Sequence, residues 1–346
     1  MRSLTSLFPR FGRPRSTPSM SHLRTAVTGL LILTAFPAWS IAHPSLSPRD
    51  NNTMPSPELA QVIPPDSWDS HMHIVDVENY ELDPSATYRP TSHSLEQALD
   101  FEASVGLQNI VLVQPSIYGL NNSCLLDGLR DLGSERGRGV VAIDPEAYDA
   151  DELRKWHELG VRGVRLNLQS VGAELNATEL EKQLTQYADA VRSLGWVVQV
   201  YVPMKMIELL EPIIPKLNVK FCIDHLGQPP LKENQGVDMY DLPGFPSLAR
   251  LLKDGLTYVK LSAPYRIAAQ ADYSDLDPLA KEVIRIAGKT HVVFATDWPH
   301  TRFEGLDIKP WMEKVVSWCG EDEQLKERLF RGNAEDLWDV KRLPRA

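Results

Sequence analysis

The sequence predicts a (β/α)8 TIM barrel that forms a single catalytic domain. From Trp68 onward, short runs rich in β-branched residues alternate with helical patterns, and eight such units extend over about 275 residues. Three of the runs end in histidine or aspartate, although they are far apart in the sequence. Such groups can meet only if the strands are parallel and share one end, where barrel enzymes place their active sites. A doubly wound sheet is the alternative, but no Gly-rich phosphate loop follows the first run.

The expected elements follow in order along the chain. Strands are predicted near residues 68–73, 109–114, 139–143, 162–167, 197–202, 219–224, 257–262 and 292–296. Helical patterns between them include residues 94–105, 151–159, 179–194 and 276–287. Glycine stands where several helices should end, and it adopts the left-handed helix-stop conformation without strain. These positions are Gly106, Gly160, Gly195, Gly255 and Gly288.

The first 42 residues differ in composition from the rest of the chain. They contain five arginines and no acidic residue, followed by an apolar stretch at 26–36 and small residues at 40–42. This arrangement is typical of a secretory signal cleaved after Ala42, so we expect a secreted protein or one in the endomembrane lumen. A mitochondrial presequence is the alternative. The apolar run is short for a membrane anchor, so no membrane association is expected once the segment is removed.

The remaining chain divides into three parts. Residues 43–65 are rich in Pro, Ser and Asn and are expected to form a linker, residues 66–340 the barrel, and residues 341–346 a short tail. Glycosylation sequons occur at Asn51, Asn121 and Asn176. A glycoprotein is therefore expected, with Asn51 in the linker as the acceptor, because a glycan on Asn121 would crowd the predicted active site.

Charge limits the partners that the protein can bind. The formal net charge is −10, and no basic surface with interleaved aromatic residues offsets it, which argues against nucleic acid. A small anionic organic substrate remains compatible, because local arginines set the field inside a pocket. The oligomeric state is not predicted by the sequence.

Four residues are candidates for catalysis. His71 and His73 are two apart on one strand, so both side chains point to the same face, and Asp69 is expected on that face one step deeper, where it would orient a histidine. His225 and Asp297 end two other runs. A carboxylate beside imidazoles can take a proton from water, while imidazole N–H groups stabilise an oxyanion. The alternatives are a half-buried strand with polar ends and, for Asp297, a helix N-cap.

Taken together, the motifs resemble the amidohydrolase superfamily, and within it the branch that includes 2-pyrone-4,6-dicarboxylate lactonase. The resemblance implies that His71, His73 and His225 polarise the scissile carbonyl and that Asp297 is the general base for water. The matching segments are His71–His73, Val113–Gly119, Asn122–Leu126, Gly160–Asn167, Asp224–Gly227, Lys260–Ser262 with Tyr265-Arg266, Thr296–His300 and Gly332–Ala334.

Substrate contacts are expected from five further residues. Arg165 and Arg266 follow the fourth and seventh strands, and a guanidinium group binds a carboxylate in a bidentate fork. Tyr88, Ser116 and Tyr201 match polar substrate contacts of the family. A second arginine that the lactonase carries shortly after the position of Arg165 is replaced here by the segment 169–172. The loops 78–92 and 226–244 are expected to act as lids that set specificity.

The resemblance favours a site without a cofactor. Metal-dependent members of the superfamily add a lysine or glutamate after the fourth strand and a histidine after the fifth, and this chain has neither. One zinc ion is the alternative, held by His71, His73, His225 and Asp297.

The function that we expect is hydrolysis of a lactone or related ester bond in a small carboxylated ring compound, which makes the protein a hydrolase. One alternative is a zinc-dependent decarboxylase or hydrolase of the same superfamily. A second is a non-catalytic secreted ligand-binding barrel.

Overall fold

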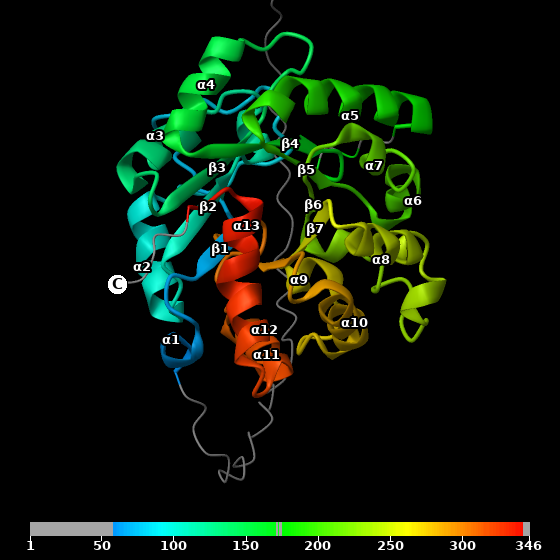
Figure 1. The fold of residues 1–346 in the computed structure, drawn as a ribbon. Helices are drawn as coiled ribbons and strands as arrows, with labels where there is room; N and C mark the ends of the chain where they lie inside the picture. Colours follow the sequence, from blue (N-terminus) through cyan, green and yellow to red (C-terminus); the bar gives the residue numbers. More distant parts are fainter. Residues whose placement is uncertain (1–57, 171, 173–174, 342–346) are drawn as a thin grey trace, which may run out of the picture. The chain divides into compact units, whose positions relative to one another are not determined.

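The computed structural model describes residues 58–170, 172 and 175–341. Its centre is one sheet of eight parallel strands that neighbour one another in chain order, from β1 to β8. Helices surround the strands on the outside (Figure 1). This arrangement confirms the predicted (β/α)8 barrel.

All eight strands coincide with expected runs, and the structure gives their limits. The strands are β1 (Trp68–Met72), β2 (Asn109–Val113), β3 (Gly137–Val141), β4 (Val161–Asn167), β5 (Val197–Tyr201), β6 (Phe221–Ile223), β7 (Thr257–Leu261) and β8 (Val292–Phe294). The strands β6 and β8 are shorter than expected, because the residues that follow them turn into the loops that carry His225 and Asp297.

The helices that pack around the strands vary in length. They are α1 (Leu59–Val62), α2 (Leu95–Val105), α3 (Ser123–Leu132), α4 (Ala150–Leu159), α5 (Ala177–Val191), α6 (Ile207–Leu210), α7 (Ile214–Leu217), α8 (Phe245–Asp254), α9 (Pro264–Ile267), α10 (Asp277–Ala287), α11 (Lys309–Cys319), α12 (Glu323–Glu327) and α13 (Asn333–Leu337). A π-helical turn, η7 (Arg328–Gly332), joins α12 to α13.

Four of the five glycines expected at helix ends have a positive φ angle, as predicted, and the fifth does not. Gly106 illustrates the rule, because it ends α2 with a φ of 84°. Gly288 is the exception: its φ is −57°, within the right-handed region. Here glycine is required for space, because a Cβ would lie 2.5 Å from the carbonyl oxygen of Ile284.

The barrel interior is filled by side chains, and its floor is closed by the end of the chain. The interior residues come from seven of the strands and from the segment around α13; they are Trp68, Val111, Val113, Val140, Val197, Cys222, Tyr258, Val293, Ala334, Leu337 and Trp338. The Trp338 Nε1 donates a hydrogen bond of 3.3 Å to Ser70 Oγ. At the red end of the ribbon in Figure 1, α13 and the turn η7 before it contact β8, and η7 also contacts β1.

The expectation for Asp69 was wrong, because β1 is irregular. Trp68 and Ser70 face the interior, whereas Asp69 faces the helix layer, beside Glu102 of α2. The pairing register shifts between Asp69 and Met72. A bulge of this kind re-aims the following side chains, so His71 turns inward although it directly follows Ser70.

Asp69 joins the first strand to the segment after the last one. Its Oδ1 accepts hydrogen bonds from the main-chain N–H groups of His71 (2.9 Å) and Thr296 (3.0 Å), and its Oδ2 accepts one from Thr296 Oγ1. The main-chain N–H of Asp297 also donates to the His71 carbonyl at 2.9 Å. Asp69 therefore orients the backbone of His71 and closes the barrel at its active end.

Several expectations fall on residues outside the described part of the chain. These are the signal or targeting segment 1–42, most of the linker, the last five residues of the tail and the sequon at Asn51. Within the expected linker, Leu59 and Ile63 are buried in the main core. Of the other sequons, Asn121 is exposed, and the Asn176 side chain caps α5. That Asn121 is unmodified and that Asn51 is the acceptor both stay predictions.

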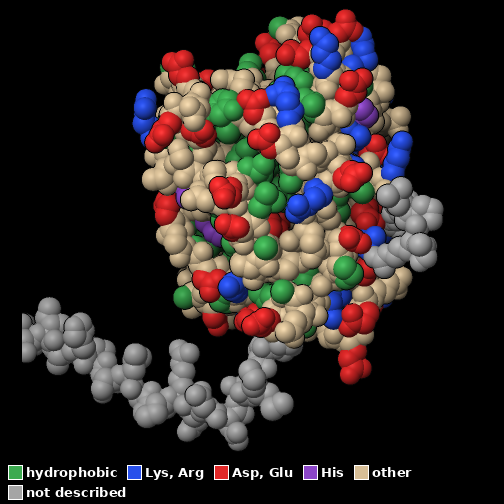
Figure 2. Space-filling view, turned by 90° about the vertical axis from the view of Figure 1, so that its left-hand side faces the viewer, with side chains coloured by type: hydrophobic (Ala, Val, Ile, Leu, Met, Phe, Trp, Pro, Cys, Tyr) green, Lys and Arg blue, Asp and Glu red, His purple; other side chains and the backbone are tan. Residues whose placement is uncertain are grey.

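The surface carries both signs of charge. On the face drawn in Figure 2, the side chains of Asp and Glu are interspersed with those of Lys and Arg. Among the described residues, no helix combines the length and apolar character needed to cross a bilayer.

The Asp69 contacts predict a specific loss of stability. In Asp69→Ala, two buried main-chain N–H groups would lose their partner, and each unsatisfied group costs about 1–3 kcal/mol. We expect the free energy of unfolding, measured with a chemical denaturant, to fall by at least about 2 kcal/mol. The matched control is Asp100→Ala on the exposed face of α2, which should stay within about 0.5 kcal/mol. Equal stabilities of the two variants would contradict the assigned role.

Candidate active site

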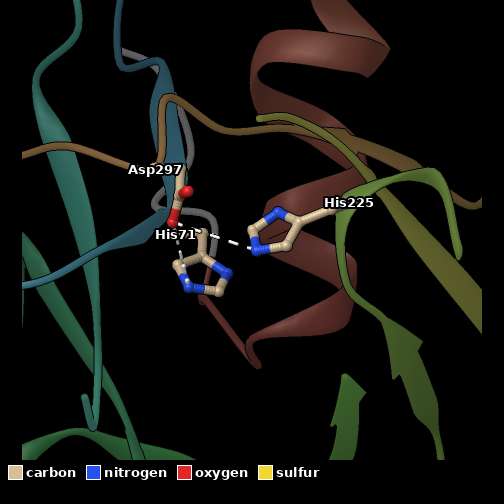
Figure 3. A group of neighbouring side chains, drawn as sticks. All are labelled: His71, His225 and Asp297. Carbon is tan, nitrogen blue, oxygen red and sulfur yellow. Dashed lines mark ion pairs between the residues drawn. The ribbon is translucent and has the colours of Figure 1, made fainter. Parts of the chain in front are cut away.

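The candidate catalytic residues come from three strand ends and converge at one point. His71 lies within β1 and His73 just beyond it, His225 follows β6 by two residues, and Asp297 follows β8 by three. Figure 3 shows the Asp297 carboxylate paired with the imidazoles of both His71 and His225. The convergence at the carboxyl ends of the strands is the one that the sequence predicted.

One carboxylate oxygen faces all three histidines. Asp297 Oδ1 lies 3.6 Å from His71 Nε2, 3.7 Å from His73 Nε2 and 3.9 Å from His225 Nε2. The Nε2 atoms of His71 and His73 are 3.3 Å apart, as expected for side chains that share a face. All four side chains are buried, so the cluster is shielded from bulk water.

The loops that carry these groups have unusual backbone conformations. His225, Ala263 and Asp297 follow β6, β7 and β8, and their φ angles are 51°, 51° and 62°. Non-glycine residues rarely adopt this region, which costs on the order of 1–3 kcal/mol, and such residues cluster at functional sites. The helix N-cap alternative for Asp297 is wrong, because the next α-helix begins only at Lys309.

The second oxygen of Asp297 is held by two donors. Oδ2 accepts a hydrogen bond of 2.6 Å from the Tyr265 hydroxyl and one of 2.8 Å from Arg266 Nε. Burial opposes ionisation of Asp297, but the Arg266 guanidinium outweighs it and holds the pKa of this carboxyl well below its usual value. Asp297 is therefore ionised, and its Oδ1 remains directed at the histidines.

The histidines are kept neutral. Burial lowers the pKa values of His73 and His225 to about 4, and burial together with Lys260 holds that of His71 well below its usual value. The Nδ1 of His73 lies 2.7 Å from the Val113 carbonyl oxygen, which can only accept. The Nδ1 therefore carries the proton, and the Nε2 of neutral His73 can accept a hydrogen bond but cannot donate one.

A buried charged layer formed by Asp224, Arg165 and Lys260 lies beneath the histidines. Of these three residues, only Arg165 was predicted to belong to the site. Asp224 accepts hydrogen bonds at Oδ2 from Arg165 (3.2 Å) and Gln199 (3.0 Å), and Lys260 lies beside it on β7. Burial opposes ionisation of Asp224, but Lys260 and Arg165 hold its pKa well below the usual value. The strand alternation of Tyr258, Lys260 and Ser262 could have indicated that Lys260 points inward.

A cavity of about 150 Å³ opens over the cluster. All five residues that were predicted to contact substrate line it, together with three of the four catalytic candidates. The lining residues are His73, Tyr88, Pro115, Ser116, Arg165, Gln169, Ser170, Tyr201, His225, Arg266, Asp297, Thr301 and Arg302. His71 lies below them and is fully buried. The lining includes three arginines against one carboxylate, so the cavity suits a small anionic molecule.

The three arginines are not equivalent. Arg165 donates to the Gln114 carbonyl at 3.0 Å and pairs with Asp224. Arg266 pairs with Asp297, so it contacts the proposed base and not only the substrate. Arg302, which the sequence analysis missed, is exposed and lies 4.2 Å from the ring centroid of Tyr88. Its position five residues after Asp297 is the sequence feature that could have indicated a role in the site.

One of the two expected lids does not reach this cavity. Tyr88 of the loop 78–92 lines it, but among the described residues the loop 226–244 contributes none of the lining. That loop instead lines a separate hollow beside α10 and reaches the site only through Gln228, which hydrogen-bonds the Tyr201 hydroxyl at 3.0 Å. The loops after β4 and β8 line the cavity in its place.

The donor atoms of the cluster have a spacing that fits one metal ion. Ligand atoms of His71, His225 and Asp297 all lie within 4.8 Å of one another. Donors about 2.0–2.2 Å from a tetrahedral zinc would be somewhat over 3 Å apart, close to the observed separations. These residues could therefore hold a single zinc ion.

Comparison with known proteins gives a family and several relatives. A family described as amidohydrolase matches residues 68–340. The 4-sulfomuconolactone hydrolase of Hydrogenophaga intermedia is 29% identical over 255 residues, which cover 72% of this chain and 80% of that protein. The 2-pyrone-4,6-dicarboxylate hydrolase of Comamonas testosteroni is 27% identical over 248 residues, covering 69% of this chain and 78% of that protein.

Solved structures share the same fold. A Pseudomonas putida structure described as a 2-pyrone-4,6-dicarboxylic acid hydrolase has a TM-score of 0.67 at 25% identity and covers 80% of this chain and 99% of its own. An amidohydrolase from Burkholderia multivorans with bound zinc has a TM-score of 0.63 at 20% identity, with the same coverage of both chains.

The pKa shifts predict how activity depends on pH. The neutral imidazoles are the working forms, and those of His73 and His225 gain protons only as the pH falls through about 4. We therefore expect kcat/KM to stay level from pH 7 to about 5 and to fall near pH 4, with an apparent pKa that belongs to the cluster. Circular dichroism at each pH is the control for unfolding. A fall near pH 6.5 in folded protein would contradict these shifts.

Proposed function

The chain belongs to the amidohydrolase family, and on that premise we propose that it hydrolyses the ring ester of a lactone in a small anionic compound. The family membership confirms the resemblance inferred from the motifs and the prediction of a hydrolase. Lactone hydrolases among the relatives support the ring ester as the bond that is cleaved. The single observation that carries the proposal is the Asp297 carboxylate that faces three imidazoles beneath a cavity lined by arginines.

In the proposed reaction, Asp297 acts as the general base. A water molecule between Oδ1 and the substrate loses a proton to this oxygen and attacks the lactone carbonyl carbon. The tetrahedral oxyanion is stabilised by hydrogen bonding from the cluster, in which His73 cannot be the donor because its Nε2 only accepts. The ring C–O bond then breaks, and the leaving oxygen takes up the proton from Asp297, which gives a hydroxyl group and a new carboxylic acid. The acid releases its remaining proton to solvent, so the ring-opened product carries a carboxylate.

Arg266 and Tyr265 support this role. By holding Oδ2, they fix the carboxylate so that Oδ1 faces the cavity. Their donors also stabilise the negative charge, which makes Asp297 a weak base in the resting site. We propose that the reaction depends on the position of this oxygen close to the attacking water, since correct placement lowers the barrier substantially.

The substrate carries an anionic group besides the lactone. Arg165, Arg266 and Arg302 line the same cavity, and guanidinium groups bind carboxylate and other planar or tetrahedral oxyanions through charge-assisted hydrogen bonds. The names of the relatives include one sulfonated and one dicarboxylated lactone. In place of the arginine missing after β4, we propose that Arg302 binds the second anionic group from the loop after β8.

We propose that the site works without a metal ion. Lys260, Arg165 and Arg266 lie within the cluster and outnumber Asp224 and Asp297. With neutral histidines the site is already positive, so a divalent cation would be repelled. In the alternative, His71, His73, His225 and Asp297 would hold one zinc ion, which would supply Lewis-acid activation of the carbonyl or of water.

The function is tested by the loss of the base. Purified protein should convert 2-pyrone-4,6-dicarboxylate or 4-sulfomuconolactone to a product that is heavier by one water, as followed by absorbance and mass. In Asp297→Asn we expect kcat to fall at least about a hundredfold, because the general base is lost. Asparagine tolerates the left-handed backbone conformation here, so circular dichroism should stay unchanged. The exposed Asp254→Asn is the matched control. Near-normal turnover by folded Asp297→Asn would refute the mechanism.

The anion-binding role is tested separately at the rim. Arg302→Ala removes an exposed guanidinium group and with it one charge-assisted hydrogen bond to the substrate, worth about 1.5 kcal/mol. We therefore expect KM to rise roughly tenfold, while kcat changes little. Arg154→Ala, at an exposed position on α4, is the control and should leave KM as it is. If both variants show the same KM, Arg302 does not bind the substrate.

Metal analysis decides between the two forms of the site. We expect far less than one zinc per chain after purification, and full activity after prolonged treatment with a chelator. The positive charge of Lys260 and the two arginines is the physical reason. Stoichiometric zinc, together with activity that is lost on chelation and restored by added zinc, would establish the metal-dependent alternative.

A further inference from the structure

Lys260 is a buried cation that the proposed reaction does not use. It lies on β7, its side chain is fully buried, and the ring of Trp338 lies on one side at 5.4 Å from its Nζ. A buried ammonium group is costly unless its hydrogens are all paired. The positions of its partners therefore indicate what the lysine does.

Three acceptors surround the Lys260 ammonium group. Its Nζ lies 2.7 Å from Gln199 Oε1, 3.1 Å from His71 Nδ1 and 3.4 Å from Asp224 Oδ1. An ammonium group has three hydrogens and no lone pair, so it can only donate. The Lys260–His71 hydrogen bond requires that Nδ1 present its lone pair, because an Nδ1–H directed at the lysine would meet another donor.

We propose that Lys260 is a positioning residue that holds His71 in the tautomer with its proton on Nε2. The proposal rests on the function proposed above and assigns different roles to the two histidines of β1. The Nε2–H of His71 points at the reaction centre and donates. The Nε2 of His73 accepts, because its Nδ1–H is taken by the Val113 carbonyl.

The resulting chain of hydrogen bonds runs in one direction. Lys260 donates to His71, the Nε2–H of His71 lies 3.3 Å from the His73 acceptor, and His73 donates to Val113. In the reaction, His71 Nε2–H donates to the oxyanion, and His73 Nε2 accepts a hydrogen of the attacking water, which orients its lone pair toward the carbonyl carbon. The opposite tautomer of His71 would place two acceptors side by side.

Asp224 competes with Lys260 for a hydrogen bond with the Nδ1 of His71, because its Oδ1 lies 3.4 Å from that atom. With the lysine removed, His71 can move its proton to Nδ1 and donate to Asp224 instead. The Nε2 would then lose its hydrogen, and the oxyanion would lose a donor. Lys260 thus acts on the reaction through His71 alone.

The tautomer can be measured in the unaltered protein without any substrate. In protein labelled with ¹⁵N-histidine, at neutral pH, the Nδ1 of His71 should resonate as an unprotonated nitrogen and Nε2 as a protonated one. His71→Asn identifies the signals by their disappearance. A protonated Nδ1 on His71 would overturn the proposal. This measurement stays decisive if the lactonase function fails or if a variant of Lys260 does not fold.

Kinetics test the consequence for turnover. We expect Lys260→Met to lower kcat about 10- to 100-fold, as for loss of one hydrogen bond to a charged group, while KM changes by less than about threefold. In the His71→Asn background the same substitution should cost nothing further, because the two residues act as one unit. An equal loss of kcat in both backgrounds would refute action through His71.

The control is the removal of another buried cation. Arg138→Met deletes a largely buried guanidinium that stacks on Trp68 and donates to the Trp338 carbonyl, far from the cavity. It should reduce stability but leave kcat within about twofold. If it lowers kcat as much as Lys260→Met does, the effect is general destabilisation, and the proposal fails.

Discussion

The active site depends on one buried carboxylate that takes no part in the chemistry. Asp69 ties the backbone of His71 to Thr296, which immediately precedes Asp297. Hydrogen bonds between neighbouring strands fix the other seven strand pairs, but between β1 and β8 this side chain supplies the link together with a few main-chain bonds. The spacing of His71 from Asp297 is therefore set by the same contact that closes the barrel, so fold and function share one constraint.

The buried charges near the active site are paired with one another, and the imidazoles stay uncharged. Asp224 is paired with Lys260 and Arg165, and Asp297 with Arg266. Buried ion pairs contribute little net stability, because desolvation offsets the attraction. Their value here lies in the field that they create: the carboxylates stay ionised and the histidines stay neutral. Hydrogen-bond direction, rather than net charge, then distinguishes one histidine from the next.

The sequence predicted the barrel and the catalytic cluster because both follow from periodicity. Two histidines separated by one residue share a face of a strand, and the ends of parallel strands meet, which was enough to bring Asp297 to His71. The side chain of Asp69 was assigned to the wrong face of β1, because the alternation of faces fails at a bulge. No residue type in Trp68–Met72 indicates that a bulge forms there. Two further contacts, Arg266 with Asp297 and Lys260 with His71, join different strands. They could not be predicted, because they depend on strand register and side-chain rotamers, which no local sequence pattern encodes.

The position of Trp338 has a consequence for how the chain folds. This residue fills the barrel floor and bonds to Ser70, 268 residues earlier. The seam at Asp69 likewise spans 227 residues. Contacts of such long range form slowly and late. During synthesis the barrel interior must therefore stay open at least until Trp338 has left the ribosome, and until then its apolar strands lie exposed to wrong partners.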